Sequence, residues 1–121
     1  MKKTALGVWG EETACRERLK KGYRIAARNY RGRFGELDIV ARKGSILAVV
    51  EVKLRKNADF GEAREYVTPA KQQKIRLTAA AFLASHAWAQ ELQPRFDVIE
   101  IYAPAGAEGP VSVRHWENAF E

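Results

Sequence analysis

The stretch from Gly35 to Arg55 constrains the fold of this chain more than any other part of the sequence. Two runs of aliphatic and β-branched residues, Leu37–Ala41 and Ile46–Val52, flank a Lys-Gly-Ser turn. Such runs on either side of a glycine-containing turn are typical of a β-hairpin. We therefore predict two antiparallel strands here.

Three charged residues, Asp38, Glu51 and Lys53, stand inside these apolar runs, where strands resist burying charge. Side chains alternate between the two faces of a strand, so Glu51 and Lys53 share one face. Leu47 and Val49 precede them on that face, which therefore changes from core to charge. The opposite face is predicted to be core throughout, with Ile46, Ala48, Val50, Val52 and Leu54.

The hairpin register predicts where Asp38 lies. With a four-residue loop over 43–46, paired positions sum to 89 and Asp38 lies opposite Glu51. With a two-residue loop the sum is 87, and the two carboxylates are diagonal neighbours on one face. Both registers bring the two Cβ atoms within roughly 5–8 Å.

Two carboxylates at that separation need positive charge between them. Lys53 supplies part of it, and a divalent cation would supply more. Carboxylate oxygens without Cys or His nearby suit a hard ion, Mg²⁺ or Mn²⁺, rather than zinc. The alternative is a cross-strand salt-bridge cluster on a half-exposed sheet, with no chemistry.

Length and composition predict one soluble domain over residues 1–121, with 46% hydrophobic and 30% charged residues. No apolar run approaches the roughly 18–20 residues of a membrane span, and Met-Lys-Lys is not followed by the apolar region of a signal peptide. The single cysteine, Cys15, excludes an intramolecular disulfide and a cysteine-based zinc site. We expect a cytoplasmic protein without a membrane partner.

Positive charge is concentrated between residues 16 and 33, against a net charge of +6 for the whole chain. Such a segment is the electrostatic pattern of a polyanion binder. The alternative is a solvated helix face followed by a basic edge strand that discourages aggregation. The basic residues, opposed only by Glu17, are Arg16, Arg18, Lys20, Lys21, Arg24, Arg28, Arg31 and Arg33.

Two helices are predicted. The first runs from Leu6 to Lys21 and ends at Gly22 in the C′ position, with Glu11 and Glu12 in its first turn. The second begins with Thr68 as N-cap and Pro69 at N1.

Lys71 and Lys74 lie in the first turns of the second helix, where the helix dipole prefers anions by roughly 0.3–1 kcal/mol per charge. A helix N-terminus attracts phosphate, and two lysines strengthen that attraction. We weigh phosphate contact equally against plain solvation for this pair.

The remaining segments complete the order α-β-β-β-α-β-β. They are a first strand at Tyr23–Tyr30, a loop at Asn57–Tyr66, a fourth strand at Arg95–Tyr102, a loop at Ala103–Pro110, a last strand at Val111–Trp116, and a tail at Glu117–Glu121 whose Phe120 packs back.

This order, with Asp38 and Glu51-Val52-Lys53 at its centre, resembles the restriction-endonuclease-like, PD-(D/E)xK nuclease fold. Leu37 stands where the superfamily motif has proline. More closely, the chain from about residue 7 to 120 resembles the bacterial YraN family, which is similar to archaeal Holliday-junction resolvases. The matching segments are GYRIAARNYR, GELDIVA, VVEVKLR, RFDVIEI and ENAF.

The resemblance implies an α/β fold with a restriction-endonuclease-like core, in which helices flank a mixed central sheet. It implies a divalent-metal-dependent endonuclease with DNA as substrate, branched DNA included. A homodimer is expected for branched DNA, because a resolvase needs two sites related by a two-fold axis.

It also implies the role of each site residue. Asp38 and Glu51 would be ligands of Mg²⁺ or Mn²⁺, with the Val52 carbonyl as third oxygen. Lys53 would orient or deprotonate the attacking water, and Glu11, or Glu12 in a shifted register, would complete the acidic site. Lys71 would face the scissile phosphate. The residues expected to bind the nucleic acid are Arg24, Arg28, Arg31, Arg33, Lys71 and Lys74.

Two other functions remain open: a non-catalytic nucleic-acid-binding module on the same fold, and a protein-interaction domain with a structural salt-bridge cluster. An inactive descendant would have little reason to keep both carboxylates and the lysine together, which favours the nuclease. His86 and His115 lie outside the acidic cluster and are interpreted as packing or surface residues.

Overall fold

The computed structural model describes residues 4–56 and 67–121. The predicted order of helices and strands is confirmed, with two short 3-10 turns added. The predicted loop at 57–66 lies outside the described residues. The elements are α1 (Ala5–Lys20), β1 (Arg24–Gly32), β2 (Gly35–Lys43), β3 (Ile46–Arg55), α2 (Pro69–Ser85), η2 (Ala87–Ala89), β4 (Gln93–Tyr102), η3 (Gly106–Glu108) and β5 (Ser112–Phe120).

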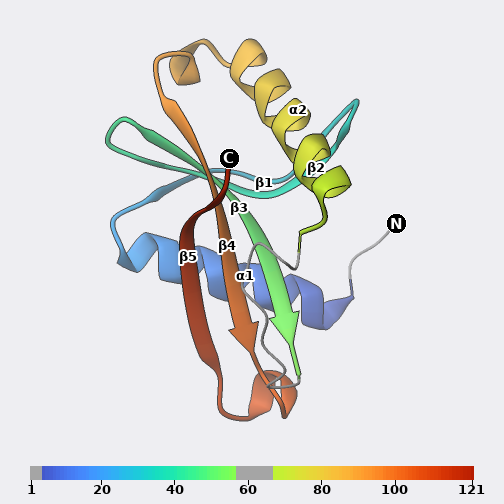
Figure 1. Ribbon diagram of the computed structural model, residues 1–121. Helices are drawn as coiled ribbons and strands as arrows, with labels where there is room; N and C mark the ends of the chain where they lie inside the picture. Colours follow the sequence, from blue (N-terminus) through green and yellow to red (C-terminus); the bar gives the residue numbers. More distant parts are fainter. Residues whose placement is uncertain (1–3, 57–66) are drawn as a thin grey trace.

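The strands form one five-stranded mixed sheet in the order β1-β2-β3-β4-β5. Only the β3–β4 pair is parallel. Parallel neighbours need a crossover connection, and α2 lies within the segment that joins them (Figure 1). The chain is therefore an α/β protein with a mixed sheet and two helices.

The two helices pack on opposite faces of the sheet. Leu47 and Val49 of β3 belong to a core cluster that includes Ile75, Ala79 and Phe82 of α2. Ala48 and Val50 belong to a second cluster with Ala14 and Cys15 of α1, as the alternation of strand side chains requires (Figure 1). The predicted apolar face of β3 is the one that α1 covers, and Glu51 and Lys53 follow Leu47 and Val49 on the α2 face.

The β2–β3 register follows the predicted sum of 89, with Ile39 paired to Val50. Lys43 pairs with Ile46, so the register has the sum of the four-residue alternative while the turn itself has two residues, Gly44 and Ser45. The pairing ends at Ile39, one residue before Asp38 would face Glu51. Leu37 packs in the α2-side cluster whereas Ile39 packs in the α1-side cluster, so β2 changes face at Asp38.

The first helix starts earlier than predicted. The side chain of Thr4 accepts a hydrogen bond from the Gly7 amide at 3.0 Å and caps the helix, which begins at Ala5. Glu11 and Glu12 therefore lie beyond the first turn, and their predicted placement there was wrong. Gly22 follows the C-cap with φ +88°, which confirms it as the C′ residue.

The second helix begins as predicted. The Thr68 hydroxyl accepts from the Lys71 amide at 3.2 Å, and Pro69 is the first helical residue. In the described part of the chain, neither helix is long and apolar enough to cross a membrane.

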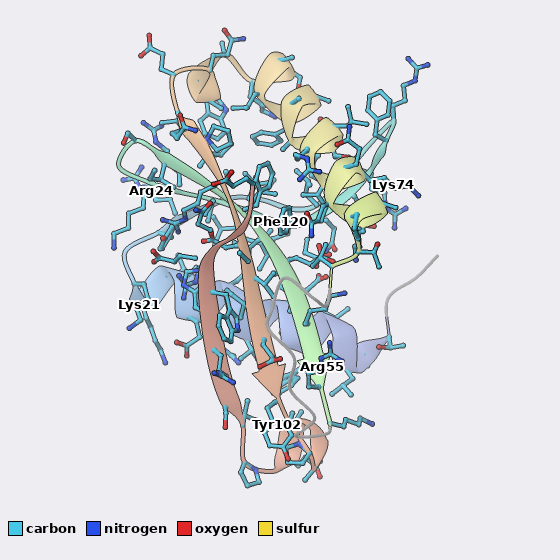
Figure 2. The ribbon with its side chains drawn as sticks, viewed as in Figure 1. Lys21, Arg24, Arg55, Lys74, Tyr102 and Phe120 are labelled. Atoms are coloured by element: carbon cyan, nitrogen blue, oxygen red, sulfur yellow. The ribbon has the colours of Figure 1, made fainter. Side chains whose placement is uncertain are left out.

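The predicted C-terminal tail is wrong, because β5 continues to Phe120. Asp97 accepts a hydrogen bond from the Asn118 amide at 2.9 Å, where the β4–β5 register shifts. Asn118 takes a left-handed conformation there, with φ +52°. Phe120 is buried and stacks on Phe96 at a centroid distance of 5.3 Å, so its predicted packing is confirmed (Figure 2).

Candidate functional site

A cavity of about 270 Å³ lies between the strands β2 and β3 and the N-terminal turns of α2. Three carboxylates and two ammonium groups line it, which is an unusual density of charge for so small a space. Asp38 and Glu51, which the sequence predicted to be neighbours, both line this cavity, as do Lys71 and Lys74. The lining residues are Gly35, Glu36, Asp38, Glu51, Lys71, Lys74 and Ile75.

The Asp38 side chain continues the strand pairing where the backbone of β2 stops. Its Oδ2 atom accepts a hydrogen bond from the Val52 amide at 2.9 Å. The N–H and C=O of one strand residue point toward the same neighbouring strand. The Val52 carbonyl therefore lies on the side of β3 that faces Asp38, as its predicted role as an oxygen ligand requires.

A close approach of backbone and helix positions the lysines over this cavity. A Cβ atom at Gly35 would lie 3.5 Å from Thr78 Oγ1 and 3.8 Å from Lys74 Cβ. These are ordinary van der Waals distances, so α2 packs directly against the start of β2 here, and the need for glycine at position 35 comes from its φ of +153°. Lys74 is labelled on α2 in Figure 2.

Glu51 is the buried centre of the site, with a side chain that is 7% exposed. The Lys71 ammonium forms an ion pair with Glu51 Oε1, and Lys53 Nζ lies 3.9 Å from the same atom. Burial raises the pKa of the Glu51 carboxyl, and the nearby charge of Asp38 raises it further. The two lysines oppose this shift without cancelling it.

The two lysines respond in opposite directions. Burial lowers the pKa of Lys53, and the positive charge of Lys71 lowers it further. Burial alone would lower the pKa of Lys71 as well, but the hydrogen bond and charge of Glu51 outweigh it, so that the pKa of Lys71 is raised. Lys71 is therefore held as a cation, whereas Lys53 gives up its proton more readily than an ordinary lysine.

Glu11 is not among the residues that line this cavity. It is buried on α1, the helix that covers the opposite face of the sheet. Within residues 4–56 and 67–121, no group of three or more His, Cys, Asp or Glu side chains is arranged to hold a metal ion. The metal-binding role of Asp38, Glu51 and Val52, and the contribution of Glu11, therefore stay predictions.

The predicted nucleic-acid-binding residues are spread over more than one surface. Arg31 lies 3.6 Å from Glu36, at the edge of the cavity, and the exposed Arg33 stacks on Phe34 at 5.6 Å. Arg28 lies near Cys15 on α1; burial raises the pKa of that thiol, and the charge of Arg28 partly offsets the rise.

Arg24 lines a different cavity, described below. Arg18, which the sequence placed in the basic segment, is only 2% exposed and stacks on Tyr23 at 5.1 Å. It is therefore unavailable to a polyanion.

Two carboxylates on the α2 side were not singled out from the sequence. Glu36 lines the cavity two residues before Asp38. Glu100 on β4 is 1% exposed and is the register partner of Lys53, and neither of its oxygens has a hydrogen-bond partner among the residues that the structure describes. A charged residue inside an apolar strand was the signal that identified Asp38, and the segment RFDVIEIY carries the same signal at Glu100.

Asp97 is also a charged residue inside an apolar strand, and its contacts show that it stabilises the pairing of β4 and β5. It is fully buried and accepts from Arg95 at 2.7 and 2.9 Å, and His115 Nε2 lies 2.9 Å away. The amide of Asn118 is a further donor. This network holds β5 to β4 and accounts for His115 as a packing residue, as predicted.

The fold and this site together define a mixed α/β protein with an acidic pair and two lysines at one cavity. The family model described as "Uncharacterised protein family UPF0102" matches residues 10–101. The chain belongs to this family, which confirms the resemblance to YraN proteins.

Relatives extend the similarity over nearly the whole chain. A UPF0102 protein of Frankia alni is 45% identical over 118 residues, which cover 98% of this chain and 96% of the relative. One of Prosthecochloris aestuarii is 44% identical over 118 residues, covering 95% and 92%. One of Kineococcus radiotolerans is 39% identical over 113 residues, covering 93% and 91%.

Proposed function

We propose that this protein is a divalent-metal-dependent endonuclease with a restriction-endonuclease-like core, which hydrolyses phosphodiester bonds of DNA. One observation carries the proposal: Asp38 and Glu51, from adjacent strands, share a cavity with lysines of α2. The mixed sheet and the order of its elements support the same class of fold.

The residues present fit Mg²⁺ or Mn²⁺. The donors would be oxygens of Asp38 and Glu51 and the Val52 carbonyl, and hard ions prefer oxygen ligands. Glu51 already attracts two cations, because Lys71 binds it and Lys53 lies 3.9 Å away. When bound, the metal would supply activation of water and stabilisation of the charge that develops on phosphorus.

Lys53 would act on the attacking water. Its ammonium is half-buried beside Glu51, and its pKa is lowered by burial and by the charge of Lys71. A lysine with a lowered pKa can accept a proton near neutral pH more readily than an exposed one. In its neutral amine form Lys53 would take the water proton as the water oxygen attacks the phosphorus, while the P–O bond to the leaving sugar oxygen breaks and that oxygen takes up a proton from solvent.

Lys71 and Lys74 would bind the scissile phosphate. Both project from the N-terminal turns of α2, where backbone amides and the helix dipole favour anions. Lys71 now pairs with Glu51, and with Glu51 serving as a metal ligand the Lys71 ammonium would be available to the phosphate. The same lysine would thus exchange one anionic partner for another when substrate and metal bind.

A second candidate function rests on the same ion pair. If Lys71 and Lys53 are the permanent partners of Glu51, the cluster is a salt bridge and the protein is a non-catalytic nucleic-acid-binding module. The ion pair between Lys71 and the buried Glu51 is the observation that favours this second candidate.

The testing experiment is cleavage of labelled DNA in Mg²⁺ or Mn²⁺, with EDTA as the metal-free control. Four-way-junction, duplex and single-stranded DNA are compared. Glu51→Gln is assayed beside the wild type. Glu108→Gln, at an exposed carboxylate of η3, is the matched control for the substitution itself.

Metal-dependent cleavage that disappears in Glu51→Gln and persists in Glu108→Gln supports the nuclease. Preference for the junction would extend it to branched DNA, which a two-fold homodimer would cut symmetrically. Binding without cleavage of any substrate would favour the non-catalytic module. Equal cleavage by wild type and Glu51→Gln would contradict the assigned site.

A further inference from the structure

A second cavity, of about 350 Å³, lies at the turn between β2 and β3. Three basic residues and no acidic one are among the described residues that line it, which are Gly22, Arg24, Arg42, Lys43 and Gly44. The two cavities are separate. Figure 2 shows Arg24 and Lys74, one from each cavity, on opposite sides of the molecule.

The strand register places like charges against one another in this cavity. Arg24 of β1 is the direct register partner of Arg42 of β2, and Lys43 follows Arg42. Like charges directly opposite one another on antiparallel strands destabilise a sheet. Across residues 4–56 and 67–121, no ion pair joins Arg24, Arg42 or Lys43 to a carboxylate. The fold therefore keeps an unfavourable concentration of positive charge without an anionic partner.

Contacts with the protein hold two of these cations in place. Lys43 Nζ donates a hydrogen bond to the Lys21 carbonyl at 2.7 Å and lies 5.3 Å from the centre of the Tyr23 ring. The Arg42 guanidinium lies 5.9 Å from the centre of the Trp88 ring. These contacts place the two side chains on different faces of β2, Arg42 on the α2 side and Lys43 on the α1 side, so Arg42 shares its face with Arg24, its register partner. The Trp88 contact limits the motion of Arg42, so an anion that binds the two arginines loses less side-chain entropy than at freely moving side chains.

The chemistry of this cavity fits a phosphate group. Arginine guanidinium groups offer parallel N–H donors that match phosphate oxygens, and Arg24 and Arg42 place two such groups on one face of the sheet. A phosphodiester satisfies both and neutralises the repulsion between Arg24 and Arg42. The cavity volume is within the usual range for small-ligand sites, roughly 300–1,000 Å³.

We propose that this cavity is a second phosphate-binding site, which takes a backbone phosphate of the nucleic acid away from the candidate catalytic cavity. Arg42 lies four residues from Asp38 along β2, which corresponds to roughly 14 Å at about 3.4 Å per residue. Because Ile39, Val40 and Ala41 between the two cavities are buried, a nucleic acid that occupies both would pass around the sheet and not along β2. The binding of one nucleic acid at both cavities rests on the proposed function, whereas phosphate binding by this second cavity does not.

The first experiment is a titration of the ¹⁵N-labelled protein with inorganic phosphate, followed by NMR of the backbone amides. We expect saturable shifts of the Gly22 and Gly44 amides, with at least tenfold weaker binding in Arg42→Gln. Arg16→Gln, at an exposed arginine on α1, removes the same charge and should bind phosphate like the wild type. Absence of localised shifts, or equal affinity in Arg42→Gln, would overturn the site.

The second experiment tests the source of the phosphate by the binding of a labelled DNA duplex in EDTA, which excludes cleavage. We expect Arg42→Gln to weaken binding severalfold and to lower the slope of log affinity against log salt by about 1. Unchanged DNA binding with lost phosphate binding would overturn the nucleic-acid part and assign the cavity to a small phosphate compound. Because neither readout needs catalysis, failure of the nuclease proposal leaves both interpretable.

Discussion

The Lys71 ammonium, from the first turn of α2, lies against the buried carboxylate of Glu51 on β3. This pair joins the helix N-terminus to the centre of the sheet. It also resolves the unfavourable position of a lysine at the positive end of a helix dipole, because Glu51 supplies the missing anion. Asp38 lines the cavity beside this pair. Two carboxylates and Lys71, whose raised pKa keeps it a cation, therefore lie together at one cavity.

Glu51→Gln should change how stability depends on pH in metal-free protein. Burial and the charge of Asp38 raise the pKa of Glu51 in the folded state, so the native protein holds this proton more tightly than the unfolded chain. The wild type therefore loses stability as pH rises from about 4.3, the unfolded value, through the raised folded pKa. Glu51→Gln should lack this loss. At pH 7 its free energy of unfolding should exceed that of the wild type by on the order of 1 kcal/mol.

Urea unfolding in EDTA between pH 4 and 8 measures this difference. Glu108→Gln serves as the control, because its carboxylate is exposed. Parallel pH curves for wild type and Glu51→Gln would contradict the raised pKa.

Asp97→Asn should destabilise the protein at neutral pH and lose its effect in acid. Hydrogen bonds from His115 and Arg95 and from the Asn118 amide outweigh the burial that would raise the pKa of Asp97, so this pKa is lowered. Breaking such a buried pair costs about 3 kcal/mol, the low end of its usual range. The ionised Asp97 stabilises the fold fully above about pH 3.9, the unfolded pKa of aspartate, and this contribution is lost as pH falls through the folded pKa.

Thermal unfolding at pH 7 and at pH 3 gives the comparison for Asp97. The gap between wild type and Asp97→Asn should be wide at pH 7 and narrower at pH 3. A gap of constant width would show that the variant acts by packing alone.

Much of this fold was predictable from local pattern. The alternation of residues along β3 gave its two faces, and Thr68-Pro69 gave the start of α2, because both depend on residues close in sequence. The partners of Lys71 and Asp97 depend on contacts between distant segments, which one sequence does not encode locally. The tail was wrongly predicted for this reason, because the Asp97 carboxylate keeps Asn118 in the sheet.

Part of the candidate site was likewise predictable from local pattern, and part of it was not. Hairpin register predicted that Asp38 and Glu51 lie near each other, and both line the cavity, although the backbone pairing ends at Ile39. The change of face at Asp38 and the position of Glu11 could not be predicted from the hairpin, since each depends on how helix and sheet pack.

Glu100→Gln should stabilise the protein. Glu100 is 1% exposed, and neither of its carboxylate oxygens has a hydrogen-bond partner in the described part of the chain. An ionised group in that setting is costly, and a neutral amide of the same shape removes the charge but stays a buried polar group, so we expect a gain of about 1 kcal/mol. Urea unfolding at pH 7 measures the change, and a loss of stability in Glu100→Gln would show that the carboxylate is compensated.

Lys74→Gln should weaken DNA binding more than Arg28→Gln does. Lys74 lines the acidic cavity, whereas Arg28 lies near Cys15 on α1. Loss of one phosphate contact lowers the slope of log affinity against log salt by about 1. Fluorescence anisotropy of a labelled duplex at several salt concentrations, in EDTA, compares the two variants, and a larger effect of Arg28→Gln would move the nucleic-acid surface to the α1 side.

The most direct test of this account is the binding of Mn²⁺, measured by electron paramagnetic resonance of the free ion. The wild type should bind Mn²⁺, and Asp38→Asn should bind it at least tenfold more weakly. Lys71→Gln removes the cation that now occupies Glu51 and should therefore bind Mn²⁺ more tightly than the wild type. Equal Mn²⁺ affinity in all three proteins, or no binding by any of them, would contradict a metal site at Asp38 and Glu51.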